Sequence, residues 1–150
     1  MELLNAAVEA GHAWQADLLL ADGGLAALRE RDDFRALLRR SETSLRAQEA
    51  ELRAEVAIVE VPRQTSNSPL LLLLGGGARE PSEFAAPWLP HDADALVAVA
   101  IPTQLRITDV PFRYFHGVER SRQDLAAALR GLDGHPFDGE RVVLGGFSRG

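Results

Sequence analysis

The first third of the chain places its apolar residues at helical spacing. Short apolar stretches at 3–8 and 17–21 each end near a glycine, as helices often do. A longer helix is predicted from about residue 32, with Asp32 or Asp33 available as its N-terminal cap. Its apolar stripe follows i, i+3, i+4, i+7, i+11 spacing, with one small polar member, and comprises Phe34, Leu37, Leu38, Ser41 and Leu45.

The spacing changes near residue 56, where "VAIVEV" begins a β-branched, strand-like run. Three further apolar runs, "PLLLLL", "ALVAVAIP" and "RVVLGG", suit strands buried on both faces of a parallel sheet. Between the last two, residues 118–132 predict a helix with Leu125, Ala128 and Leu132 on one face. The pattern predicts a helical segment over 1–55 and an α/β domain over 56–150, with right-handed crossovers.

Composition excludes several function classes. The formal net charge of −6 over 150 residues argues against polyanionic partners such as nucleic acid. No cysteine occurs, which excludes disulfides, thiolate metal sites and a cysteine nucleophile. All 16 basic residues are arginine, so a P-loop lysine and a Schiff-base lysine are excluded too. No signal peptide, membrane span or metal-ligand spacing is visible, so we expect a cytoplasmic protein without cofactor or metal.

The segment with the clearest chemistry is "GGFSRG" at 145–150, directly after an apolar run. A serine hydroxyl needs a base and must project from the backbone to reach a substrate carbonyl. A sharp strand-to-helix turn projects it, and small residues two before and two after the serine relieve the crowding. Ser148, with Gly146 and Gly150, fits this arrangement as a nucleophile. The alternative is an ordinary Gly/Ser turn after a strand.

A second glycine-rich segment, "LLLLLGGGARE", follows an earlier predicted strand. Acyl transfer needs backbone N–H donors for the oxyanion. One donor would be the N–H of Arg149, the residue after the nucleophile, and another would come from a loop such as this one. The other interpretations are a flexible turn and a phosphate cradle, although no Gly-Lys-Ser/Thr sequence follows it.

In order, "SPLLLLLGGGAREPSEFAAPWLP", "ALVAVAIPTQ", "RQDLAAALRGL" and "ERVVLGGFSRG" resemble α/β-hydrolases of the phospholipase/carboxylesterase type. The resemblance implies a three-layer, mostly parallel sheet, Ser148 as nucleophile, and oxyanion donors at the N–H groups of Arg149 and the Gly76–Gly77 turn. The helical segment is similar to the last unit of tetratricopeptide-like arrays, which implies a possible protein partner there.

Three positions depart from the family pattern. Gly75 stands where relatives carry the histidine of a Leu-His-Gly-x-Gly turn, and Ala78 where they carry its second glycine. Arg149 replaces the usual glutamine of the elbow. In "FRYFHG", Tyr114, Phe115 and His116 fall where relatives line the pocket, although packing on the sheet is the preferred interpretation.

The family places its catalytic acid and histidine after the serine. Here all four histidines precede Ser148, as do the acids of the 133–140 turn, so we expect none of them to complete a triad. The expected explanation is that the chain is the N-terminal part of a longer hydrolase whose acid and histidine lie downstream. The four histidines are His12, His91, His116 and His135.

The sequence therefore predicts a serine carboxylic-ester hydrolase that forms an acyl-enzyme on a small-molecule ester and is inactive as this chain alone. The alternative is a non-catalytic helical binding module supported by a degenerate hydrolase sheet. An open reading frame beyond codon 150 with a later aspartate and histidine would favour the enzyme. An immediate stop codon would favour the binding module.

Overall fold

The computed structural model describes residues 1–60, 68–75, 77, 79–89, 94–108 and 112–147. The chain forms two compact units, here called the helical unit (1–52 and 105–112) and the sheet unit (53–104 and 113–150). The expected boundary near residue 55 is close to the observed one. However, residues 105–112 leave the sheet unit and join the helical unit, which the sequence pattern does not indicate.

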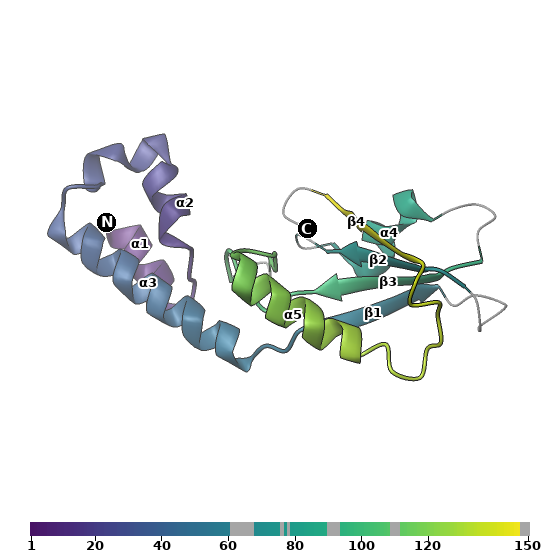
Figure 1. The fold of residues 1–150 in the computed structure, drawn as a ribbon. Coiled ribbons are helices and arrows are strands. Elements are labelled where there is room, and N and C mark those ends of the chain that lie inside the picture. The colour runs from purple at the N-terminus through teal and green to yellow at the C-terminus, as the bar shows by residue number, and fades with distance from the viewer. Residues whose placement is uncertain (61–67, 76, 78, 90–93, 109–111, 148–150) are drawn as a thin grey trace. The chain divides into compact units, whose positions relative to one another are not determined.

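The helical unit is built around one long helix. α3 (Asp32–Glu51) packs against two shorter helices, and its predicted stripe of five residues is buried throughout. Leu19, Phe34, Leu37 and Leu38 form the main core of this unit. The other elements, shown in Figure 1, are α1 (Glu2–Glu9), α2 (Ala16–Ala21) and η1 (Gly23–Leu28).

The polar member of the stripe has a specific partner. Ser41 is fully buried, and its Oγ accepts from the N–H of Trp14 at 2.8 Å and donates to the carbonyl of Trp14 at 2.9 Å. A buried hydroxyl with both bonds made is tolerated, whereas an unpaired one would be costly. Ser41 therefore fastens the loop before α2 to the long helix.

The start of α3 differs from the expected cap. The N-cap is Arg31, which makes no side-chain cap bond, and Asp32 and Asp33 are the first two helical residues. Arg31 instead donates from Nε and Nη2 to the carboxylate of Asp33, at 3.0 and 2.7 Å. This hydrogen bond lowers the pKa of Asp33. The two carboxylates in the first turn also stabilise the helix through their interaction with its dipole.

Residues 105–108 complete the helical unit. Leu105 is buried with Ala13 and Leu45 in a second small core. The hydroxyl of Thr108 accepts from the N–H of Ala13 at 2.9 Å, and the N–H of Leu105 donates to the carboxylate of Glu49 at 2.7 Å. The segment is therefore held by burial and by directional hydrogen bonds.

The sheet unit contains a mixed four-stranded sheet in the order β1-β3-β2-β4. β1 pairs antiparallel with β3, whereas β2 is parallel to both β3 and β4. The predicted α/β class is thus confirmed at this coarse level. The elements are β1 (Glu55–Glu60), β2 (Leu70–Leu74), α4 (Pro81–Ala85), η2 (Ala86–Trp88), β3 (Leu96–Ile101), α5 (Val118–Arg130) and β4 (Val142–Gly146).

Helices cover both faces of this sheet (Figure 1). On one face, Leu70, Leu72 and Ala98 pack against Ala128 of α5 and against Leu132, which follows that helix. On the other face Leu73, Val97 and Val99 pack with Phe84 and Ala85 of α4. The crossovers β2-α4-β3 and β3-α5-β4 run in opposite directions along the sheet, so helices on opposite faces give both the same hand.

β4 is the exception to the predicted burial. Val142, Val143 and Leu144 are 43%, 57% and 59% exposed, so the expectation of a strand buried on both faces is wrong here. β4 pairs with β2 on one side only and is an edge strand of the described sheet. This strand therefore leaves an open apolar edge on the described sheet.

Candidate active site

The two glycine-containing segments that the sequence analysis singled out follow adjacent strands. β2 and β4 run parallel and in register, with Leu74 opposite Gly146. Gly75 continues from β2 and Phe147 from β4, so both segments leave the sheet at the same, carboxyl edge. In open α/β sheets this is the edge at which ligands bind. Residues 72 positions apart in the sequence, Leu74 and Gly146, are thereby brought opposite each other.

Gly75 is required by the close approach of β3. Its N–H donates to the carbonyl of Ala100 at 3.0 Å. An added Cβ would lie 2.9 Å from Val99 Cγ1 and 3.1 Å from that same Ala100 oxygen. Any side chain here would therefore force Val99 and the Ala100 carbonyl to shift.

Gly77 is the predicted oxyanion residue that the structure describes. It has a positive φ of 108°, a conformation that favours glycine. Its N–H donates to the carbonyl of Arg113 at 2.9 Å, so this donor is already paired. An oxyanion at this N–H would have to replace the Arg113 carbonyl as acceptor.

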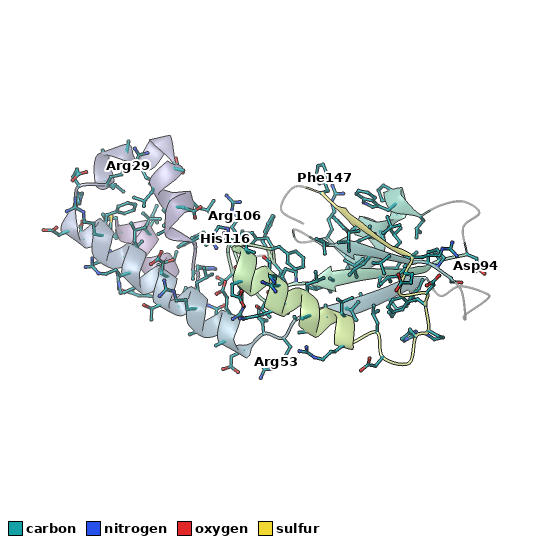
Figure 2. All side chains as sticks on the ribbon, viewed as in Figure 1. Arg29, Arg53, Asp94, Arg106, His116 and Phe147 are labelled. Atoms are coloured by element: carbon teal, nitrogen blue, oxygen red, sulfur yellow. The ribbon has the colours of Figure 1, made fainter. Side chains whose placement is uncertain are left out.

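Four of the predicted site residues, Gly76, Ser148, Arg149 and Gly150, lie outside the described residues, as does Ala78. Gly146, the first elbow glycine, is the last residue of β4. Phe147 follows it and is 73% exposed. Figure 2 shows Phe147 beyond the carboxyl end of β4 and Asp94 at the amino end of β3, so the two labels mark opposite edges of the sheet.

The described histidines lie in loops, and the acids of the 133–140 segment lie at the amino edge of the sheet. His12, His116 and His135 are all in loops, and His91 lies outside the described residues. The three acids of the α5–β4 connection, Asp133, Asp138 and Glu140, precede β4. Because β4 is parallel to β2, that connection is at the amino edge, opposite the candidate site.

A buried polar network that the sequence analysis missed lies at the carboxyl end of β3. The carboxylate of Asp124 on α5 accepts from the N–H of Thr103 at 2.9 Å and from its hydroxyl at 2.9 Å. Asp124 and Thr103 are both 4% exposed. Arg120 donates to the Thr103 hydroxyl at 2.6 and 3.0 Å. The network ties the start of α5 to the loop that follows β3.

One signal could have revealed this network. Asp124 stands at i−4 from Ala128 and beside Leu125, on the helix face that the pattern assigns to the core. A carboxylate on a core-facing stripe needs a buried partner. Gln104, next to Thr103, is a second buried polar residue, and its Nε2 has no hydrogen-bond partner within the described part of the chain.

An open groove adjoins the same edge of the sheet. It has a volume of about 560 Å³ and lies between the end of β2 and the first half of α5. Phe115 lines it and also packs on the α5 face of the sheet, whereas Tyr114 is fully buried and His116 is exposed. The full lining is Leu74, Phe115, Gly117, Val118, Ser121, Arg122 and Leu125.

Among the residues that the structure describes, no group of three or more histidines and acids could hold a metal ion. In the same residues no helix combines the length and apolar character that a membrane crossing needs. Comparison with family models, with curated proteins and with solved structures gives no match to this chain.

Proposed function

We propose that the chain is part of a serine carboxylic-ester hydrolase of the α/β-hydrolase type, with Ser148 as nucleophile. The observation that carries the proposal is the register of β2 and β4. Leu74, which precedes the Gly75–Gly77 segment, lies opposite Gly146, the first residue of the Gly-Phe-Ser-Arg-Gly segment, on an adjacent parallel strand. A nucleophile and its oxyanion donors need such closeness, because both must reach one carbonyl group.

The layered sheet supports the same proposal. A mostly parallel sheet with helices on both faces is the arrangement that the family resemblance implies. Attack of the Ser148 hydroxyl on an ester carbonyl would form an acyl-enzyme and release the alcohol, and water would then release the acid. The N–H of Arg149 and the Gly76–Gly77 turn would stabilise the oxyanion in both steps.

The test is ester hydrolysis by the protein encoded by the complete reading frame. We expect turnover of short p-nitrophenyl esters, and a loss of more than about a thousandfold in Ser148→Ala. Ser82→Ala, an exposed serine of α4, is the matched control and should retain activity. Undiminished hydrolysis by Ser148→Ala would refute the assignment.

The 150-residue chain by itself is expected to be inactive. No histidine follows Ser148 in it, and the family's base follows the nucleophile. A fluorophosphonate probe should therefore label the chain slowly, since an unactivated serine is a poor nucleophile. Rapid labelling at Ser148 would show that a base from elsewhere in the chain serves it.

The binding-module alternative is favoured by one observation, the pairing of the Gly77 N–H with the Arg113 carbonyl. A sheet that serves only as support needs no free oxyanion donor. Absence of turnover in the complete protein, together with an intact fold by circular dichroism, would favour this alternative.

A further inference from the structure

Among the described residues that line the groove between β2 and α5, most are apolar and one is charged. Leu74, Phe115, Val118 and Leu125 supply the apolar surface, and Arg122 is the charged residue among the lining side chains. None of the described residues that line the groove carries a carboxylate. A volume of about 560 Å³ is within the usual range for small-molecule sites, and apolar walls with one or two polar groups are typical of them.

Arg122 is available to a ligand. It is exposed, and its side chain makes no hydrogen bond or ion pair within the part of the chain that the structure describes. The nearby acids have other partners: Glu119 accepts from Gln123 at 3.2 Å, and Asp124 is bound to Thr103. A guanidinium group matches a carboxylate geometrically and is weakly hydrated, so it binds one well beside an apolar surface.

The groove also reaches the carboxyl end of β2, which is paired with β4, the strand that precedes the candidate nucleophile in the sequence. Leu74 lines it and is paired in register with Gly146, the first glycine of the Gly-Phe-Ser-Arg-Gly segment. A molecule in the groove therefore lies beside the edge from which both predicted catalytic segments leave.

From these observations we propose that the groove binds an anionic amphiphile, with its hydrocarbon chain on Leu74, Phe115 and Leu125 and its carboxylate on Arg122. Resting on the proposed function, this names the substrate class: an ester that also carries a free carboxylate on an apolar chain. A neutral ester of the same length would bind more weakly, because Arg122 would lose its partner.

The first test is binding of decanoate to the 150-residue chain by calorimetry, with backbone NMR shifts to locate it. We expect decanoate to bind and to shift signals of residues 117–125. Acetate, which lacks the chain, and decyltrimethylammonium, which has the opposite charge, should bind at least about tenfold more weakly. Equal binding of all three would overturn the proposal.

Variants distinguish the loss of the Arg122 charge from a loss of folded structure. Arg122→Gln should weaken decanoate binding about tenfold, Arg122→Lys should restore part of it, and Arg130→Gln on the same helix should change nothing. Val118→Asp should abolish binding without unfolding the chain, because Val118 is 78% exposed and stands in the first turn of α5. Unchanged binding in both Arg122→Gln and Val118→Asp would refute the proposal.

Three further outcomes distinguish the groove proposal from the hydrolase proposal. If sedimentation shows a dimer whose dissociation moves the 117–125 signals, the groove belongs to a second copy and the proposal fails. If the unsubstituted protein shows no ester turnover but binds decanoate, and Ser148→Ala binds it equally well, the groove proposal is supported and only the proposed hydrolase is refuted. Ester turnover without decanoate binding would refute the substrate class and leave the hydrolase standing.

Discussion

At Gly75, next to the candidate site, neighbouring atoms leave little room for a side chain. A methyl group there would lie 3.1 Å from the Ala100 carbonyl oxygen and 2.9 Å from Val99 Cγ1. We expect Gly75→Ala to lower the free energy of unfolding by about 1–3 kcal/mol, as overpacking against backbone does. Urea denaturation followed by circular dichroism measures this change in unfolding free energy.

The matched control for Gly75 is Gly139→Ala. A Cβ at Gly139 meets nothing within 4 Å, and its φ is not positive. This variant should leave the midpoint of unfolding nearly unchanged or raise it slightly, because alanine restricts the unfolded chain. Equal losses in both variants would show that Gly75 is not sterically special.

The carboxylate of Asp124 stabilises the fold by accepting hydrogen bonds from Thr103. Its removal would leave the buried N–H and hydroxyl of Thr103 without their acceptor. Asp124→Ala should therefore cost about 2–3 kcal/mol of unfolding free energy, whereas Asp133→Ala, which removes an exposed carboxylate, should cost little. Thermal unfolding of the two variants compares them, and similar midpoints would contradict the buried network.

At the scale of elements, the sequence predicts those whose pattern is set by local burial. α3 has the predicted stripe because 3.6-residue spacing keeps one face toward the core. β2 and β3 are buried as predicted because helices cover both their faces. β4 (VVLGG) is also free of polar residues, but it has only one neighbour in the described sheet. The number of neighbouring strands depends on the whole sheet and cannot be predicted from a local pattern.

The exposure of β4 predicts self-association. An edge strand with apolar, uncharged side chains can pair with another edge. Val143→Lys should lower light scattering at high protein concentration, with little change in unfolding free energy, since Val143 is 57% exposed. Leu3→Lys, at an 86% exposed position of α1, is the control. Scattering that falls equally in both variants would indicate a general charge effect.

For the molecule as a whole, the sequence indicates two parts but not how the chain is shared between them. The change from helical to strand spacing near residue 55 is a local signal, and the observed boundary is close to it. Residues 105–112 join the helical unit through Leu105 burial and the Thr108 and Glu49 hydrogen bonds. Partners so distant in sequence leave no periodic trace. The Asp124–Thr103 network differs in this respect, because the core-facing position of Asp124 on α5 is a local signal that its carboxylate needs a buried partner.

Each unit contains one tryptophan, Trp14 in the helical unit and Trp88 in the sheet unit, so the stability of each can be followed separately. Leu105→Ala removes a side chain that is 4% exposed within the helical core, which should cost about 2–5 kcal/mol there. In a Trp88→Phe background, Trp14 fluorescence should report an earlier urea transition. In a Trp14→Phe background, Trp88 should report an unchanged one. Equal shifts in both backgrounds would mean that the two units unfold as one cooperative body, and that residues 105–112 contribute to the stability of the whole chain.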